Sequence, residues 1–361
     1  MKLGTTTISL VALLAALLVL PACTINLGTN ANVSRAPEGG IWKSVDSGHL
    51  WSQSNILALS GGKAGTISGV EVQKIVFDPQ DSKAIYLATG NDGIIYTYDN
   101  GVTWRKFNQL SAGRIRSIAV DPKNKCILYA LMDNKVYKSQ DCGRFWQVAY
   151  YHQDPAVVLT DITINKNNPA TIFVSNSKGE IIKSTDAGNA WAINYRLPVN
   201  TTVVEIVPDL IDSRIMYVGT KSQGIYKTAD GGDSWASLGD GLKSYSGSHE
   251  YKKLIMDPAT PNSLIFISKF GMLISRNGGN SWDMVNLLPS PKAVTIYTVA
   301  VNPKDSNEIY YTTQTTLVKS LDGGKTWSSQ KLPFSNRWPN AMAVNPASSS
   351  VLYLGTVGPT K

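Results

Sequence analysis

Seven carboxylate or amide side chains recur along the chain in one frame, Ser/Thr-x-Asp-x-Gly-x-x-Trp. Carboxylates can serve as general acids, general bases or metal ligands when a fold brings them together. The last copy reads SLDGGKTW at 320–327, and the third positions of the frame are Asp46, Asp99, Asp141, Asp186, Asp230, Asn277 and Asp322. A motif repeated so regularly indicates first a repeated structural unit, and only second a chemical function.

The residue types of the frame suit a tight turn. An Asp or Asn side chain can accept hydrogen bonds from backbone N–H groups just ahead of it. Glycine adopts a positive φ at little steric cost, and Trp adds a large apolar surface at the start of a strand. We therefore interpret the seven Asp and Asn residues as structural fasteners of turns.

Other carboxylates lie between the repeats, at Asp154, Asp240 and Glu250. A glycoside hydrolase needs two carboxylates facing each other across a cleft, about 6.5–9.5 Å apart if it inverts. No recognisable motif surrounds these three residues. The chain also shows no phosphate-binding glycine loop, no nucleophile elbow and no clustered metal-ligand spacing. The sequence predicts no metal, no cofactor and no enzymatic activity.

Aromatic and basic residues gather in the variable segments that join one repeat to the next. Such a mixture suits a sugar ring, a peptide segment or an anionic polymer; the alternative is that the aromatic rings only pack against neighbouring repeats. His residues in such loops are more often hydrogen-bonded or solvated than catalytic. The candidate ligand rim comprises Tyr150, Tyr151, His152, Tyr195, Arg196, Tyr245, His249, Arg337 and Trp338.

The elements that must position these residues follow from the spacing of the frames, which recur about every 45 residues. Each interval holds alternating apolar runs, an Asp/Asn-Pro turn and further β-rich runs, as in SIAVDPKNKCILYAL at 117–131. Four antiparallel strands per repeat indicate a propeller blade. A WD-repeat architecture is excluded, because its paired Gly-His and Trp-Asp signatures are missing.

The two ends of the repeat region complete each other. The first frame is preceded only by GGIWK, whereas the last is followed by a strand pair at 341–356. We predict an all-β fold over residues 40–361: a seven-bladed β-propeller of four-stranded antiparallel blades, closed by strands from both termini. The ligand mouth is expected on the face opposite the frame turns. Whether segment 52–73, which lengthens the first interval, covers that mouth is left open.

The N-terminus predicts export. An uncharged run at 8–20 follows Met1-Lys2, and Leu20-Pro21-Ala22-Cys23 resembles the bacterial lipoprotein cleavage box. In that family the Cys thiol is lipidated and the chain is cut before it; the alternative is an ordinary secretory signal. We predict a signal peptide at 1–22, lipidation at Cys23, a flexible tether at 23–39, and anchoring to the bacterial cell membrane or outer membrane.

Two further cysteines, Cys126 and Cys142, each lie eight residues from a turn at Asn134. An antiparallel register would place them roughly opposite each other, and an exported protein meets an oxidising compartment. We expect a Cys126–Cys142 disulfide; the alternative is two unpaired core residues.

The net charge of +8 favours anionic partners, but the basic residues are scattered, so a nucleic-acid partner is not expected. The frame resembles the Asp-box, or bacterial neuraminidase repeat. Together with the lipoprotein start, the propeller resembles the photosystem II stability/assembly factor family and sortilin-type propellers. The assembly-factor family has a basic patch. In this chain the candidates for such a patch are Arg105, Arg114, Arg116, Arg196 and Arg337, none of which matches a motif position of the family.

The resemblance implies a membrane-anchored extracytoplasmic lipoprotein, a monomeric propeller that binds an envelope or membrane protein as a non-catalytic assembly platform. The alternative is a carbohydrate-active propeller, which binds glycans or is a sialidase-like or xyloglucanase-like glycoside hydrolase. Carboxylates clustered in the central mouth would favour the enzyme. An apolar-aromatic patch with a basic rim would favour the platform.

Overall fold

The computed structural model describes residues 37–288 and 295–359. The predicted signal peptide, Cys23 and the tether up to residue 36 lie outside the described residues. The compact unit begins at Pro37. Just after it, a Glu38 carboxylate oxygen accepts hydrogen bonds from the backbone N–H groups of Ser335 and Asn336 at 2.7 and 3.0 Å.

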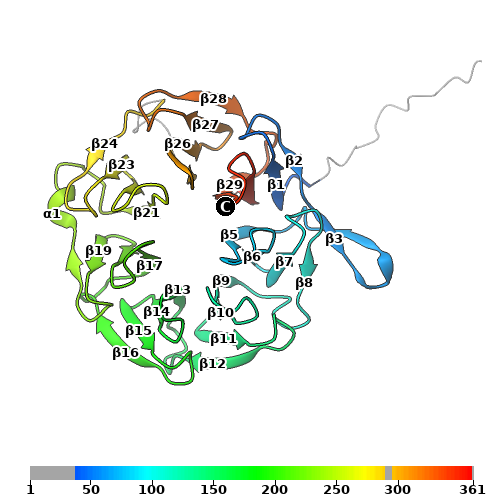
Figure 1. Cartoon of the computed structure of the whole chain (residues 1–361), viewed down its shortest axis with the longest axis horizontal. Coiled ribbons are helices and arrows are strands. Elements are labelled where there is room, and N and C mark those ends of the chain that lie inside the picture. The colour runs from blue at the N-terminus through cyan, green and yellow to red at the C-terminus, as the bar shows by residue number, and fades with distance from the viewer. Residues whose placement is uncertain (1–36, 289–294, 360–361) are drawn as a thin grey trace, which may run out of the picture. The chain divides into compact units, whose positions relative to one another are not determined.

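Seven four-stranded antiparallel sheets surround a central axis, as Figure 1 shows. The strands of the first six blades, from the inner to the outer strand, are β5–β8 (Val72–Phe77, Ile85–Thr89, Ile94–Thr97, Arg105–Lys106), β9–β12 (Ile115–Val120, Leu128–Met132, Lys135–Ser139, Gln147–Tyr151), β13–β16 (Leu159–Ile164, Ile172–Asn176, Glu180–Ser184, Ala192–Arg196), β17–β20 (Val203–Pro208, Met216–Thr220, Gly224–Thr228, Ala236–Ser237), β21–β24 (Tyr251–Met256, Leu264–Ser268, Gly271–Ser275, Asp283–Met284) and β25–β28 (Thr298–Asn302, Asp305–Thr312, Thr316–Ser320, Ser328–Lys331). We number these blades 1 to 6 in that order.

The seventh blade joins the two ends of the propeller. Its inner pair is β29 (Trp338–Val344) and β30 (Leu352–Val357), and its outer pair is β1 (Ile41–Ser44) and β2 (Ser52–Gln53). β1 pairs antiparallel with β30, so hydrogen bonds between the two ends close the ring. The predicted seven-bladed, all-β fold with closure by both termini is confirmed.

The core lies between blades. Seven clusters of buried apolar side chains are found, and each draws on two neighbouring blades. Between blades 1 and 2, for example, Tyr86 and Ile94 pack with Ile118 and Leu128. Each blade therefore buries both faces of its sheet, and second strands such as β6 and β22 are buried over their whole length.

The frame turns share one hydrogen-bond pattern in all seven blades. The Ser or Thr hydroxyl donates to the Asp or Asn Oδ1 at 2.6–3.0 Å. It also accepts from the glycine N–H at 2.8–3.2 Å. The same Oδ1 accepts the N–H four residues ahead at 2.8–3.0 Å. These carboxylates and amides are engaged by their own turns.

Lysine residues just before the frame connect one blade to the next, a feature that the sequence analysis missed. Lys138 lies over the Tyr129 ring, and its Nζ donates to the carbonyl of Ala187, in the frame of the next blade, at 2.7 Å. Four such links run from Lys43 to Asn100, Lys138 to Ala187, Lys183 to Gly231 and Lys227 to Gly278. The frame turns thus also join neighbouring blades.

A disulfide joins Cys126 and Cys142. Cys126 lies in the turn between β9 and β10, and Cys142 is the fourth residue of the frame in blade 2. The Cys142 N–H also donates to the Cys126 carbonyl at 3.0 Å. The bond therefore links the two turns of one blade on the face that carries the frames.

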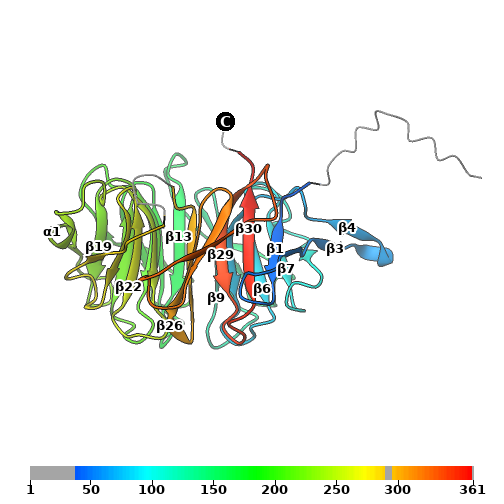
Figure 2. The same ribbon diagram turned by 90° about the horizontal axis from the view of Figure 1, so that it is seen from above.

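The middle of segment 52–73 projects from the perimeter of the ring rather than over its mouth (Figures 1 and 2). It forms a hairpin of β3 (Ile56–Ala58) and β4 (Ala64–Thr66), with a 3-10 turn, η1 (Ser60–Gly62), at its tip. Backbone bonds to Trp104 hold the hairpin beside blade 1. In the part of the chain that the structure describes, no helix is long and apolar enough to span a membrane.

Candidate functional site at the central mouth

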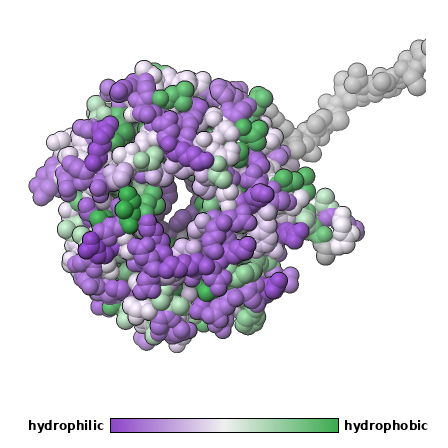
Figure 3. Space-filling model, viewed as in Figure 1, coloured by the Kyte–Doolittle hydropathy of each residue, from purple (hydrophilic) through white to green (hydrophobic). Residues whose placement is uncertain are grey.

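The central mouth lies where the inner strands begin, on the face opposite the frame turns. In each blade the frame turn bonds to the turn at the far end of the inner strand, as Ala187 does through its N–H to the Ala170 carbonyl. The beginnings of the inner strands line a cavity of about 510 Å³ on the ring axis. Figure 3, viewed down the ring axis, shows that the ring is open at its centre.

A β-bulge near the start of the inner strand shapes this mouth. Six of the seven inner strands shift register against their partner at an equivalent position, for example between Val72 and Lys74. A bulge leaves one residue unpaired and redirects the side chains beside it. Lys74, Asp161, Glu205 and Lys253 all follow such a bulge and all line the cavity.

Lys74 and Asp161 form an ion pair between blades 1 and 3. The Lys74 Nζ donates to Asp161 Oδ1 at 2.7 Å and to the Ser117 hydroxyl at 3.2 Å. Asp161 Oδ2 accepts the Ile206 N–H at 2.9 Å, so the contacts span blades 1 to 4. Burial disfavours the charge on Lys74, but its attraction to Asp161 and Glu205 prevails, and the pKa of Lys74 is raised.

Glu205 is engaged in the same way by blade 5. The Tyr251 hydroxyl donates to Glu205 Oε2 at 2.9 Å, and the Lys253 ammonium pairs with Oε1. Burial first, and then the neighbouring Glu205, raise the pKa of Tyr251 well above its ordinary value. Gly219 admits this ring, because a Cβ there would lie 2.0 Å from Tyr251 carbon atoms. The Tyr251 hydroxyl is consequently neutral at neutral pH and donates its hydrogen bond to Glu205.

The remaining charges of the mouth are positive. Five cationic side chains and two carboxylates line the cavity, and both carboxylates are already paired with lysine. Arg114, Arg116 and Lys252 make no ion pair with any carboxylate of the described residues. Burial, followed by repulsion from Arg114, lowers the pKa of Arg116. The mouth therefore offers an anionic ligand three cations that are not held in ion pairs.

Two of the predicted rim residues lie beside this mouth. Arg337 and Trp338 stand at the start of β29, both half-buried. The Trp338 ring lies 5.7 Å from that of Tyr297, which itself lines the cavity. Aromatic surface thus borders the cationic mouth on one side.

The other predicted rim residues do not gather there. Tyr150, Tyr151, His152 and Arg196 line a separate groove of about 780 Å³ at the outer edges of blades 2 and 3. Tyr245 and His249 line a third pocket, of about 370 Å³, beside α1 (Gly239–Leu242). Tyr195 packs against a buried cluster instead. The structure thus divides the predicted rim among several places, because the segments that carry these residues belong to different blades around the ring.

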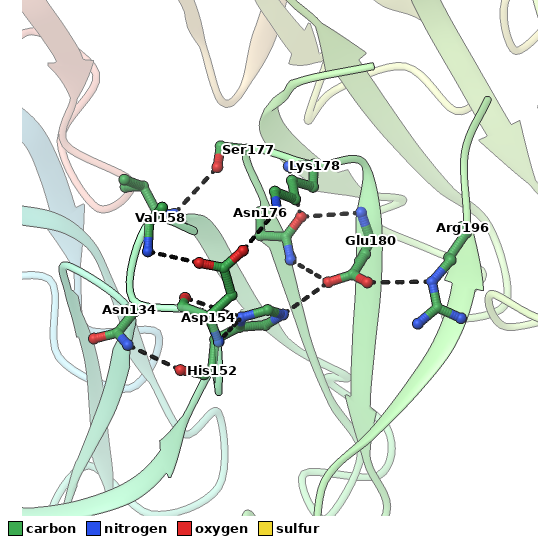
Figure 4. Close-up of polar contacts among 10 residues, drawn as sticks. Asn134, His152, Asp154, Val158, Asn176, Ser177, Lys178, Glu180 and Arg196 are labelled. Atoms are coloured by element: carbon green, nitrogen blue, oxygen red, sulfur yellow. Dashed lines mark hydrogen bonds and ion pairs between the residues drawn. The ribbon is translucent and has the colours of Figure 1, made fainter. Parts of the chain in front are cut away.

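His152, Glu180 and Arg196, which line this groove, belong to a polar cluster that is drawn in Figure 4. His152 Nε2 lies 3.0 Å from Glu180 Oε2, and Arg196 Nε lies 3.2 Å from Glu180 Oε1. Asn176 donates to Glu180 Oε2 at 2.7 Å. Burial would raise the pKa of Glu180, but these three hydrogen bonds outweigh it, so that the pKa is lowered. Glu180 was not among the predicted rim residues, because it lies at the start of a strand and the prediction was drawn from the joining segments.

The three predicted carboxylates do not form a catalytic pair. Asp154 pairs with Lys178 at 2.6 Å, Asp240 with Lys243 at 2.7 Å and Glu250 with Lys269 at 2.7 Å. None of the three carboxylates lines the central cavity. In the part of the chain that the structure describes, no cluster of His, Cys, Asp and Glu could hold a metal ion.

Comparison with known proteins gives distant similarities of two kinds. No protein-family model matches the chain. Among curated proteins, the chain is similar to a xyloglucanase of a Paenibacillus species, with 25% identity over 270 residues, and to xyloglucanase Xgh74A of Acetivibrio thermocellus, with 24% over 229 residues. The matches cover 59% and 57% of this chain but only 26% and 24% of those proteins. The chain therefore spans about a quarter of the length of these relatives.

Solved structures of two kinds share the fold. YCF48 bound to a D1 peptide superposes with a TM-score of 0.61 at 16% identity, covering 80% of this chain and 94% of that one. YCF48 from Cyanidioschyzon merolae gives 0.60 at 16% identity, covering 79% and 95%. The GH74 enzyme of Niastella koreensis gives 0.59 at 16% identity, covering 84% of this chain and 53% of that one. The predicted likeness to an assembly factor is thus supported for the fold.

The prediction that the protein has no enzymatic activity is contradicted. The curated relatives are xyloglucanases, and a GH74 enzyme shares the fold, so that these distant similarities point toward glycoside hydrolases. The predicted carboxylates lie in the joining loops, whereas the carboxylates of the mouth lie inside strands. The one sequence signal is that Lys74, Ser117, Asp161, Glu205 and Lys253 occupy the same position of successive repeats.

Proposed function

We propose that the protein binds an acidic segment of a partner polypeptide at its central mouth. The observation that carries this proposal is the set of cations outside ion pairs, Arg114, Arg116 and Lys252, at a cavity whose two carboxylates are already paired. Carboxylates of a partner would form charge-assisted hydrogen bonds with the guanidinium groups. Trp338 and Tyr297 would contact the apolar parts of the segment.

The comparison with YCF48 supports a polypeptide ligand. That propeller was solved with a D1 peptide bound, and the shared fold spans nearly its whole chain. Fold alone does not set function, so the argument rests on the charges of this mouth. The net charge of +8 extends the same attraction to longer range.

Binding or hydrolysis of a β-glucan is the second candidate, favoured by the sequence similarity to xyloglucanases. Asp161 and Glu205 are the carboxylates that the mouth offers for such chemistry. A glycoside hydrolase needs one carboxyl group to act as general acid. Here Lys74 and Lys253 occupy both groups, so a sugar would have to displace these lysines before hydrolysis.

We also propose that the propeller is held at the outer side of a bacterial membrane by a lipid on Cys23. The apolar run and the cleavage-box resemblance support this placement. Mass spectrometry of the mature protein tests it: a diacylglyceryl-modified Cys23 as the first residue is expected. An unmodified chain cut elsewhere would contradict the proposal, and Cys23→Ala should release the protein from membranes.

The two candidate functions are separated by titrating the full chain, in detergent, with two probes. The first is an octaglutamate peptide and the second a xyloglucan oligosaccharide, with reducing ends assayed in parallel. Salt-sensitive binding of the octaglutamate peptide is expected. Binding of the oligosaccharide but not of the peptide would overturn the proposal. Release of reducing ends that Asp161→Asn abolishes would establish the second candidate.

A further inference from the structure

Blades 2 and 3 differ from most other blades in their outer strands. β12 and β16 each contain five residues, whereas β2, β8, β20 and β24 contain two. An outer strand has a free edge, where backbone N–H and C=O groups have no partner in the sheet. Natural proteins usually keep such edges short or guard them with charged residues.

The two long edges carry apolar side chains in the open. Val148 and Tyr151 on β12 are 47% and 63% exposed, and Ile193 on β16 is 38% exposed. β28 is the next longest outer strand, and its four residues are Ser, Ser, Gln and Lys. Blade 6 therefore guards its edge with polar residues, but blades 2 and 3 do not.

The groove between β12 and β16 is a built cavity. Tyr150 and Trp191, whose rings lie 5.8 Å apart, form its floor. The end near His152 is closed by the cluster with Glu180 and Arg196. Only the Nε of Arg196 is bound to Glu180, and the side chain stays 66% exposed, so its terminal amines can meet a further anion.

We propose that this groove binds a second polypeptide segment, in extended conformation, as an added strand on the free edge of β12. A strand presents its N–H and C=O groups every two residues, which is the spacing that a free strand edge can pair with. Alternate apolar side chains of the segment contact Val148, Tyr151 and Ile193. An acidic side chain or a terminal carboxylate lies at Arg196, where the charge is complementary.

This groove is distinct from the central mouth and uses different chemistry. The mouth attracts charge, whereas the groove combines backbone pairing with apolar contacts and the exposed end of the Arg196 side chain, beside carboxylates that are already paired. Failure of one site therefore leaves the other intact. Loss of Arg114 and Arg116 should not change binding in the groove, which separates this inference from the proposed function.

Selection from a phage-displayed heptapeptide library on the full chain tests the proposal, with the variant Val148→Lys/Ile193→Lys for counterselection. Enriched peptides should alternate apolar residues and contain Asp or Glu near one end. Leu321→Lys, at a similarly exposed apolar residue on a frame turn, is the matched control and should bind these peptides like the unmodified chain.

An enriched peptide is then synthesised with and without methylation of alternate backbone nitrogens. Methylation should weaken binding at least tenfold, because it removes the donors that pair with β12. Arg196→Gln should weaken the acidic peptide severalfold but leave its Asn or Gln counterpart unchanged. Equal binding of the methylated peptide, or no enrichment over the counterselected variant, would overturn the proposal, as would capture of a xyloglucan oligosaccharide that displaces the peptide from the groove.

Discussion

The two faces of the ring carry polar residues of different kinds. On the frame face, seven almost identical turns engage their Asp and Asn side chains internally, within eight residues. On the mouth face, the equivalent residues of successive blades differ, and their charges pair across blades, as Lys74 and Asp161 do. Repetition thus marks the parts that build every blade. Variation at an equivalent position marks the part that can recognise a ligand.

The largest effect on stability is expected at the mouth, from Asp161→Ala. Asp161 is only 2% exposed, and its removal leaves the Ile206 N–H and the Lys74 ammonium without their partner. We expect a loss of about 2–3 kcal/mol in the free energy of unfolding, measured by urea denaturation. Asp154→Ala, whose ion pair with Lys178 lies at the surface, should cost clearly less stability.

A smaller loss is expected from a single frame turn. Ser184→Ala removes a buried hydroxyl that accepts the Gly188 N–H at 2.8 Å and donates to Asp186 at 2.9 Å. We expect about 1–2 kcal/mol of destabilisation in urea. Ser177→Ala, on the mouth side, is the control and should lose less stability. If both variants lost equal stability, the frame turns would not be the special fasteners of the fold.

The smallest effect is expected for the pH-dependent part of the stability that a single frame carboxylate contributes. Hydrogen bonds from the Thr326 side chain and backbone lower the pKa of Asp322 to about 2, against about 3.9 in an unfolded chain. A lowered folded-state pKa adds stability above the unfolded value, and this stability is lost as the pH falls from about 4 toward 2. Asp322→Asn should therefore lose less stability than the parent between pH 5 and pH 2, as followed by urea midpoints. An identical pH profile would contradict this.

The fold could be read from the sequence because each blade repeats its own local rules. The frame, the Asp/Asn-Pro turn and the alternating strands lie within 45 residues, so spacing alone predicts seven blades. The lysines before the frame were missed, since their partners lie one blade further along the chain. Lys138 and Ala187, for example, are 49 residues apart.

The site could not be read in the same way. Lys74 and Asp161 are separated by 87 residues, and the bulges that aim them into the mouth depend on pairing with the second strand. Within its own strand, each of these two residues is simply a polar residue among apolar ones. The predicted rim was drawn from loops instead, and the structure divides those loops among separate pockets.

The central claim is that the mouth face binds the ligand, whereas the frame turns on the opposite face stabilise the blades. The most direct test compares two charge-matched variants in binding to octaglutamate at low salt. Arg114→Gln/Arg116→Gln should weaken binding about tenfold and flatten its salt dependence, because two ion pairs with the peptide are lost. Arg144→Gln/Arg276→Gln, which removes the same charge from the frame turns, should bind like the parent. Equal weakening by both variants would show that net charge alone attracts the peptide, and the claim would fail.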